Sequence, residues 1–135
     1  MRIHPLSEGS FTIDHTKVFV PFSASENSIV DKGSLLVEIQ PFVVITQNDI
    51  ILLDTGLGYT RSNGTLQIHE NLMALGIDPS SVTKVFMSHL HKDHAGGLSY
   101  VHAQHGDRFI SFPYATHYIQ RREYELALTK ASASY

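Results

Sequence analysis

Four potential metal ligands lie within six consecutive positions, in the segment His89-Leu90-His91-Lys92-Asp93-His94. The chain has nine histidines in 135 residues, and three of them fall in this segment. The apolar run from Val82 to Met87 precedes the segment and predicts a short buried strand. A single histidine would be explained as an ordinary loop residue, but four ligand-type residues at the end of a strand favour a metal site.

The spacing of these four residues suits two neighbouring metal ions. In an extended segment residues 89, 91 and 93 point to one side, and two imidazoles can then reach one ion at about 2.0–2.1 Å. If the chain turns after His91, Asp93 and His94 face a second point nearby. Two cations about 3.5–4 Å apart can share a hydroxide and activate it against a carbonyl or phosphoryl group. Imidazole and carboxylate suit zinc, and also iron or manganese.

Two further features accompany the histidine cluster. Asp54 directly follows the apolar run Ile50 to Leu53, and by itself it would be an ordinary turn residue at the end of a strand. Beside a metal cluster, its carboxylate could accept the free N–H of a ligating histidine or hold the loop. We therefore predict that Asp54 orients a ligand. Gly96 and Gly97 are expected to let the backbone pack closely behind the ligands.

Strand and helix patterns alternate along the chain and predict an α/β (α+β) layered domain. Pro41 interrupts one of the strand patterns, which is therefore expected to form two short strands or a bulged edge. Leu66, Leu72, Met73 and Leu75 form the expected apolar stripe of the first helix, and Thr116 is the expected N-cap of the second. A short helix is expected to begin near Ala95. The predicted strands and long helices cover residues 11–22, 35–46, 50–53, 82–87 and 108–112, and residues 65–75 and 116–130.

Composition excludes several classes of function. At 135 residues, with 42% hydrophobic and 17% charged residues, the chain is expected to form one ordered domain at most. The net charge of -3 gives no basic face, so no nucleic-acid partner is expected. The absence of cysteine excludes disulfides, cysteine zinc sites and thiol catalysis. No apolar span or signal-peptide pattern is present, so we expect no membrane association and a cytoplasmic location.

The segments Ile51-Leu52-Leu53-Asp54-Thr55-Gly56 and Ser88-His89-Leu90-His91-Lys92-Asp93-His94-Ala95-Gly96-Gly97 together resemble the metallo-β-lactamase superfamily. The resemblance covers about residues 35–130. The second segment is most similar to the lactonase-type branch, which opens acyl-homoserine lactones and related rings. The resemblance implies an αββα sandwich with two metal ions, expected to be zinc, at one edge between two β-sheets.

The same resemblance implies a role for each residue of the cluster. His89 and His91 would bind the first metal, and Asp93 and His94 the second. Asp93 would also be a catalytic residue that takes a proton as the leaving group departs. A metal-bound hydroxide would attack the carbonyl of an ester, lactone or thioester, and the metals would stabilise the oxyanion.

Members of this family continue well past residue 135. Their second half supplies one more histidine for the first metal, a bridging aspartate, and a final histidine for the second metal. Residues 1–135 are therefore expected to form one metallo-β-lactamase-like domain truncated before its second half, the N-terminal half of the sandwich. His102, His105 and His117 do not lie in those second-half patterns, and we interpret them as surface or loop histidines.

Three hypotheses about function remain at this point. The first is a metal-dependent, lactonase-like hydrolase of a small-molecule substrate. The second is a catalytically inactive metal-binding half-domain that forms a homodimer through the sheet face which a second half would cover. The third is a nuclease or phosphodiesterase, which the mildly acidic charge balance disfavours. Candidate walls of a substrate pocket, each more commonly a core residue, are Phe11, Phe19, Phe22 and Tyr59.

Overall fold

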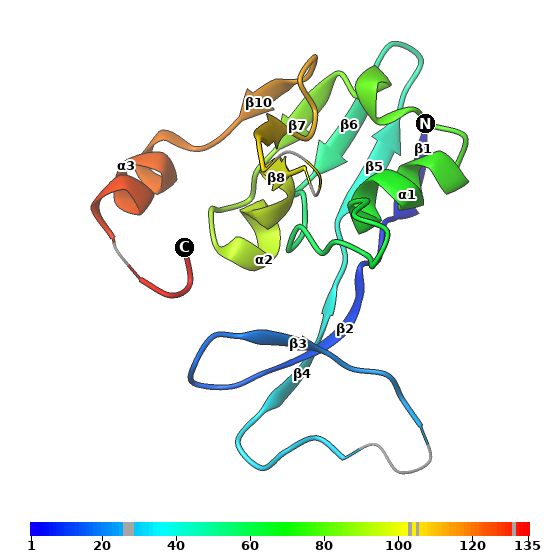
Figure 1. The fold of residues 1–135 in the computed structure, drawn as a ribbon. Helices are drawn as coiled ribbons and strands as arrows, with labels where there is room; N and C mark the ends of the chain where they lie inside the picture. Colours follow the sequence, from blue (N-terminus) through cyan, green and yellow to red (C-terminus); the bar gives the residue numbers. More distant parts are fainter. Residues whose placement is uncertain (26–28, 103, 105, 131) are drawn as a thin grey trace.

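Figure 1 shows the computed structural model of the chain, which describes residues 1–25, 29–102, 104, 106–130 and 132–135. Its body is a five-stranded sheet of order β1-β5-β6-β7-β10. β1, β5 and β6 are antiparallel neighbours, whereas β6, β7 and β10 run parallel. The strands are β1 (Arg2–Pro5), β5 (Phe42–Ile45), β6 (Ile50–Leu53), β7 (Lys84–Phe86) and β10 (Thr116–Tyr118).

A smaller antiparallel sheet of order β3-β2-β4 projects from this body (Figure 1). A further pair of strands, β8 and β9, is antiparallel. The mixture of sheets and helices confirms the α+β fold class. No helix in the described part of the chain is long and apolar enough to cross a membrane. The remaining elements are β2 (Gly9–Ile13), β3 (Phe19–Pro21), β4 (Leu35–Ile39), β8 (Ser99–Val101), β9 (Arg108–Ile110), α1 (Gln67–Ala74), η1 (Pro79–Ser81), α2 (Lys92–Ala95), η2 (Gly96–Leu98) and α3 (Arg121–Thr129).

One face of the five-stranded sheet carries the hydrophobic core. Val43, Leu52 and Val85 lie at the same register on β5, β6 and β7, and all three are fully buried. They belong to one cluster with Ile68 and Leu72 of α1. Because side chains alternate between the two faces of a strand, the neighbours of these three residues in each strand point to the opposite face. The core therefore holds β6 and β7 side by side and parallel, so that their carboxyl ends meet at one edge.

The opposite face of the same sheet carries a row of apolar side chains at one matching register. The rings of Phe86 and Tyr118 are stacked there, with centroids 4.5 Å apart and planes 8° from parallel. These side chains are exposed, and the four large ones keep 36–42% of their surface accessible. The row, which we call the open face, consists of Pro5, Phe42, Leu53, Phe86 and Tyr118.

Pro41 separates two strands that belong to different sheets, β4 and β5, so the expectation of two short strands is confirmed. α1 lies within the predicted helix, but its apolar stripe was partly wrong. Met73 and Leu75 are exposed, whereas Ile68 is fully buried. The helix lies against the sheet on the side of Leu66, Ile68 and Leu72, because those residues reach the core formed by β5, β6 and β7.

The prediction of one strand over residues 11–22 was wrong. The segment forms two strands, β2 and β3, paired as a hairpin. Asp14 makes the turn between them, because its Oδ1 accepts a hydrogen bond from the backbone N–H of Thr16 at 2.8 Å. Lys17 completes the turn with a φ of 61°. Apolar residues stand before and after this polar turn, so the sequence pattern resembles that of a single strand.

The prediction of one helix over residues 116–130 was also wrong. Its first residues form β10 beside β7, and α3 begins only at Arg121. The N-cap is Gln120, whose side-chain oxygen accepts from the backbone N–H of Glu123 at 3.1 Å. Thr116 belongs to a strand because it pairs with the edge of β7. The helix or strand propensity of the local sequence does not reveal such a pairing.

Candidate metal centre

Asp54 joins the ends of β6 and β7. Its backbone N–H donates to the carbonyl of Phe86 at 2.9 Å. Its Oδ1 accepts from the N–H of Ser88 at 2.7 Å, and its Oδ2 accepts from the Ser88 hydroxyl at 2.7 Å. Asp54 has a φ of 61°, in the left-handed region that residues other than glycine rarely adopt. Backbone strain of this kind is typical of positions where a functional side chain must point in one particular direction.

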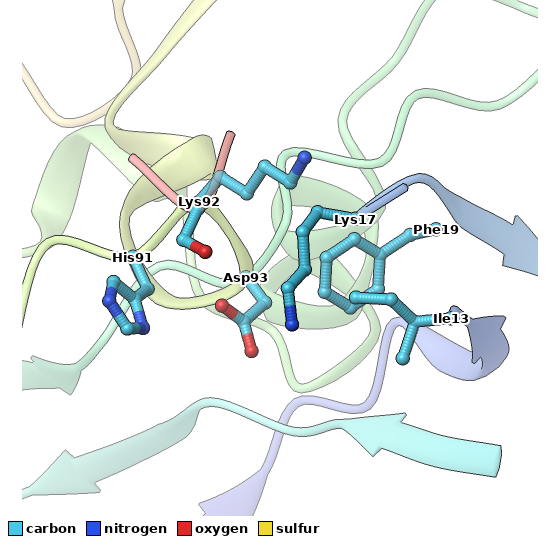
Figure 2. Close-up of a pocket in the computed structure, with 7 residues that line it drawn as sticks. Ile13, Lys17, Phe19, His91, Lys92 and Asp93 are labelled. Carbon is cyan, nitrogen blue, oxygen red and sulfur yellow. The ribbon is translucent and has the colours of Figure 1, made fainter. Parts of the chain in front are cut away.

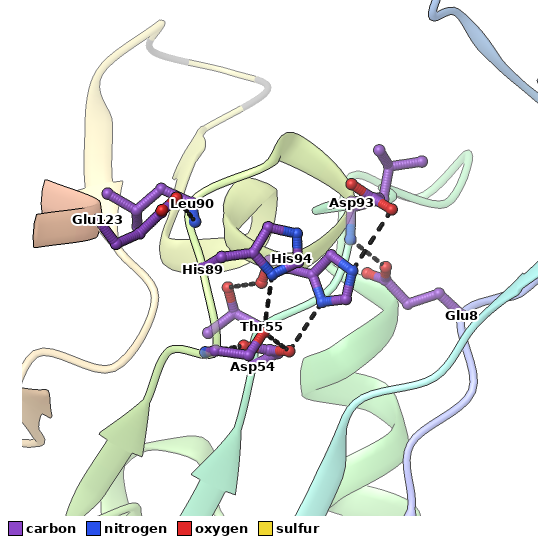
Figure 3. A network of polar contacts seen from close by, with 10 residues as sticks. Glu8, Asp54, Thr55, His89, Leu90, Asp93, His94 and Glu123 are labelled. Carbon is purple, nitrogen blue, oxygen red and sulfur yellow. Dashed lines mark hydrogen bonds and ion pairs between the residues drawn. The ribbon is translucent and has the colours of Figure 1, made fainter. Parts of the chain in front are cut away.

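The same carboxylate also holds His94. Oδ2 of Asp54 lies 2.8 Å from Nδ1 of His94, as Figure 3 shows. A carboxylate only accepts, so this contact places the proton of a neutral imidazole on Nδ1 and leaves the lone pair on Nε2. Asp54 thus lies where the sequence analysis expected an orienting carboxylate, and its effect on a ligand stays a prediction.

α2 carries Asp93 and His94 in its first turn. The chain is extended at His91, which has φ -61° and ψ 145°, and the helix starts at Lys92. The short helix expected near Ala95 corresponds to η2, whereas the preceding α2 was not predicted. The carbonyl of His91 accepts from the N–H groups of His94 and Ala95 at 2.9 and 2.8 Å. The chain therefore turns directly after His91, and the segment is not extended as far as residue 93.

The structure brings the four candidate ligands together. The ring centroid of His89 lies 4.0 Å from that of His94 and 4.7 Å from that of His91. Nε2 of His94 lies 3.5 Å from Oδ2 of Asp93. Among the described residues, no group of three or more such side chains has its donor atoms placed to hold a metal ion. Their assignment as ligands therefore stays a prediction.

The chemistry of the donor set fits a divalent metal ion. Burial lowers the pKa of His89, and the neighbouring His94 and His91 lower it further. A lowered pKa favours the neutral imidazole, which is the form that binds a metal. Nitrogen donors from three histidines and oxygen donors from Asp93 match zinc, iron or manganese better than calcium or magnesium.

Two glycines bring the backbone behind α2 into close contact with the loop after β6. A Cβ added at Gly96 would lie 2.2 Å from the carbonyl oxygen of Leu57, and one at Gly97 would lie 2.1 Å from that of Thr55. The N–H of Gly97 donates to the carbonyl of Gly56 at 3.2 Å. The expected close packing of Gly96 and Gly97 is confirmed.

A cavity of about 160 Å³ lies beside the cluster (Figure 2). It is bounded on one side by α2 and the residue before it, and on the other by the β2–β3 hairpin. Nζ of Lys92 lies 5.8 Å from the ring centroid of Phe19, across this cavity. A small carbonyl compound could therefore reach the candidate ligands from this side. The lining residues are Ile13, Lys17, Phe19, His91, Lys92, Asp93 and Ser134.

The other candidate wall residues lie elsewhere. Phe11 is buried, and its ring centroid lies 5.5 Å from that of Tyr59. Phe11, Phe22 and Tyr59 line a separate cavity of about 420 Å³. Of the predicted pocket walls, only Phe19 lies beside the cluster among the residues that the structure describes.

The three histidines that were expected at surface or loop positions differ in their surroundings. His117 is exposed on β10, as a surface histidine should be. His102 follows β8 and is partly buried, and its ring centroid lies 6.2 Å from that of Phe109. His105 lies outside the described residues.

Two acidic residues near the cluster were not found by sequence reasoning. Glu123 of α3 accepts from the N–H of Leu90 at 2.9 Å, which fixes the segment between the first two histidines. Glu8 is buried and accepts from the N–H groups of Leu57 and Tyr59. Neither lies in a motif, and each is far from residues 89–94 in sequence, so no local signal pointed to them.

The chain is similar in sequence and in structure to proteins named as lactonases. An N-acyl homoserine lactonase, AttM of Azorhizobium caulinodans, is 50% identical over 56 residues, which are 42% of this chain and 17% of that protein. A solved N-acyl homoserine lactone lactonase described as quorum-quenching matches with a TM-score of 0.61 and 27% identity over 96% of this chain and 49% of its own. AidC, a dizinc quorum-quenching lactonase, matches with a TM-score of 0.67 and 24% identity over 96% of this chain and 45% of its own.

The chain thus spans about half the length of these solved structures. The structural likeness confirms the expected fold for the part that is present. The model of the family described as the metallo-beta-lactamase superfamily matches residues 37–133, which include Asp54 and the whole histidine cluster. The chain therefore belongs to the metallo-β-lactamase superfamily.

Proposed function

We propose that this chain carries the first-half ligands of a two-metal hydrolase that opens lactones or related carboxylic esters. The observation that supports this most is the hydrogen bond from His94 to Asp54 at the meeting ends of β6 and β7. This hydrogen bond orients His94 within the cluster of three histidines. A histidine that binds a metal is held in place by such a partner. The lactonases to which the chain is similar support the substrate class.

In this proposal His89 and His91 bind one zinc ion, and Asp93 and His94 bind the other. Bound zinc supplies a hydroxide nucleophile near neutral pH and polarises the carbonyl. Asp54 holds the proton of His94 on Nδ1, so that Nε2 is free to bind. Asp93 lines the cavity beside the cluster, and its carboxylate receives the proton that passes to the departing alkoxide oxygen.

The cavity beside Asp93 fits a small substrate with an apolar part. Ile13 and Phe19 form an apolar wall on the hairpin side, opposite His91 and Asp93. A carbonyl placed at the cluster would leave its hydrocarbon substituent against this wall. The remaining wall would come from residues outside this chain, because the chain spans about half of the solved lactonases.

The test combines metal content with turnover. We expect the double variant His89→Ala/His91→Ala to lose bound zinc, measured by elemental analysis after equilibrium dialysis, and to lose hydrolysis of an acyl-homoserine lactone. His117→Ala, which removes an exposed histidine of β10, is the matched control and should change neither. Unchanged zinc content and unchanged hydrolysis in the double variant would refute the proposal.

We infer a second candidate function from the open face: a metal-binding half-domain that associates with a second copy of itself. Exposed apolar side chains continue across all five strands of the sheet at one register. Contiguous apolar surface of this kind is typical of an interface. Stoichiometric zinc in a dimer without turnover of esters, lactones, thioesters or phosphodiesters would favour this alternative. Robust turnover of lactones by the purified chain would exclude it.

A further inference from the structure

Glu8 is a buried acidic residue that the proposed chemistry does not use. It lies in the link between β1 and β2, and only 6% of its surface is exposed. Its Oε2 accepts from the N–H of Leu57 at 2.6 Å, and its Oε1 accepts from the N–H of Tyr59 at 3.2 Å. The carboxylate thus holds two backbone groups of the loop after β6 from a position about 50 residues away in sequence.

The loop held by Glu8 is confined on its other side by the segment after α2. A Cβ added at Gly56 would lie 2.3 Å from Oε2 of Glu8, so the loop backbone touches the carboxylate directly. A Cβ added at Gly58 would lie 2.5 Å from the carbonyl oxygen of Gly96. Residues 56–58 therefore form a layer between Glu8 and the residues that follow α2.

The same layer is bonded to the backbone of the candidate ligands. The N–H and the hydroxyl of Thr55 both donate to the carbonyl of His94, at 2.8 and 3.1 Å. Gly56 forms a parallel β-bridge with Ala95. Figure 3 shows Glu8 on the same side of His94 as Asp93. A shift of residues 56–58 would thus move the backbone of α2 and of His94 with it.

We propose that Glu8 is a positioning residue: its carboxylate fixes the loop of residues 56–59, and this loop fixes α2 and so the placement of Asp93 and His94. The link from α2 to a bound metal rests on the proposed function. The link from Glu8 to α2 rests only on the contacts of this chain. A positioning residue of this kind acts through two layers of backbone and touches neither metal nor substrate.

The burial of Glu8 indicates that its carboxylate does more than stabilise the fold. Burial raises the pKa of Glu8 to about 7, although hydrogen bonds from Leu57, Tyr59 and Gly58 lower it. The charged carboxylate is therefore costly in this position, and an apolar side chain would fill the same space without that cost. What an apolar side chain cannot do is accept the N–H groups of Leu57 and Tyr59.

The experiment compares Glu8→Ala and Glu8→Gln in the full chain with Asp78→Asn as a control. Asp78 precedes η1, which β7 separates from the cluster in the chain, and its exposed carboxylate accepts from the N–H and the hydroxyl of Ser80. Two quantities are measured: amide hydrogen exchange at single residues, and the affinity and visible absorption spectrum of bound Co²⁺. Glu8→Gln keeps the size of the side chain, so it remains informative if Glu8→Ala does not fold.

We expect both Glu8 variants to raise amide exchange about tenfold or more at Leu57 and Tyr59, and also at Thr55 and Gly97, with no change in β6. The dissociation constant for Co²⁺ should rise about three- to tenfold, since partners beyond the ligands tune metal affinity. Asp78→Asn should change neither quantity.

Faster exchange at Leu57 and Tyr59 alone, with Thr55, Gly97 and Co²⁺ affinity unchanged, would overturn the proposal. If the wild-type chain and its Glu8 variants all fail to bind Co²⁺, the proposed metal centre is refuted as a property of this chain. Exchange at Thr55 and Gly97 then still decides whether Glu8 positions α2.

Discussion

Oδ2 of Asp54 lies 2.8 Å from Nδ1 of His94, although the two residues are 40 positions apart in the chain. The contact exists because β6 and β7 are parallel neighbours, which brings the residues that follow them to the same edge of the sheet. It joins the segment after β6 to the histidine cluster, as the orienting role predicted for Asp54 requires. The first prediction tests what this contact does.

Asp54→Asn should weaken zinc binding about 10- to 100-fold, as loss of such partners does elsewhere. The asparagine oxygen can still accept from the N–H of Ser88, which directs its NH2 group at His94. An NH2 donor favours the tautomer with the proton on Nε2, and that nitrogen then cannot bind a metal. Zinc affinity is measured by competition with a chromophoric chelator.

Asp49→Asn is the control for Asp54→Asn. Asp49 also lies beside β6 and β7, but its carboxylate pairs with Lys84 and Thr83 at the opposite end of the strands. It should leave zinc affinity unchanged. Equal affinities of wild type and Asp54→Asn would show that the contact with His94 does not orient a ligand.

Gly97→Ala should destabilise the fold by about 2–3 kcal/mol, because the added Cβ would overlap the carbonyl oxygen of Thr55. Gly97 lies in the short η2 turn, and the neighbouring atom belongs to backbone, which cannot move aside as a flexible side chain would. The free energy of unfolding is measured by urea denaturation.

Gly33→Ala provides the comparison for Gly97→Ala. Gly33 has a φ of 93° but no atom within 4 Å of an added Cβ, so its replacement costs only backbone strain of about 1 kcal/mol. If the two variants lose equal stability, the close approach behind α2 is looser than the structure indicates.

The stability of wild type relative to Glu8→Gln should fall as the pH rises from about 4.5 to about 7. Burial raises the pKa of Glu8 from its ordinary 4.5 to about 7 in the folded chain. Over this window the unfolded chain releases a proton that the folded chain keeps, so stability decreases with pH. The difference should reach about 3 kcal/mol, at about 1.4 kcal/mol per pKa unit.

Urea denaturation of both proteins at pH 5 and pH 8 measures this difference. Contributions from all other titrating groups are common to the two proteins and cancel. Two pH profiles that run parallel would mean that Glu8 is not desolvated in the folded chain.

Phe86→Lys should reduce self-association of the purified chain. Phe86 lies between Leu53 and Tyr118 on the open face and stacks on Tyr118, so a lysine there places a charge on the apolar surface of both copies in a symmetric pair. Sedimentation velocity over a range of concentrations measures the monomer fraction. Val20→Lys, at an exposed position of β3 outside the open face, is the control. Wild type that stays monomeric at every concentration would exclude the open face as a homodimer interface.

The sequence predicted the parts of the fold in which local pattern and tertiary packing agree. The apolar run before Ser88 became β7, whose Val85 is fully buried in the core. The position of Asp54 followed from the same logic, because a residue just after a buried strand lies at the edge of a sheet. The histidine cluster was recognisable because its residues are adjacent in sequence.

The remainder depends on contacts between distant segments. Thr116 has the side chain of a helix cap, but β7 offers an unpaired edge, and pairing with it makes Thr116 part of β10. Lys92 continues an extended pattern in sequence, yet α2 starts there because the chain turns after His91. Glu8 has no neighbour in sequence that indicates its loop contacts. Such residues require the assembled structure.

The close packing of Thr55 and Leu57 against Gly96 and Gly97 bears on the placement of the histidines but not on the shape of the cavity. Evolution or design could therefore alter these two properties independently. The placement of the histidines is determined by main-chain contacts within the body of the molecule, whereas Ile13 and Phe19, which line the cavity, belong to a different sheet. Substitutions at Ile13 and Phe19 can therefore change which molecules fit the cavity while the candidate metal centre keeps its geometry. A scaffold divided in this way is a suitable starting point for redirecting selectivity by mutating the hairpin alone.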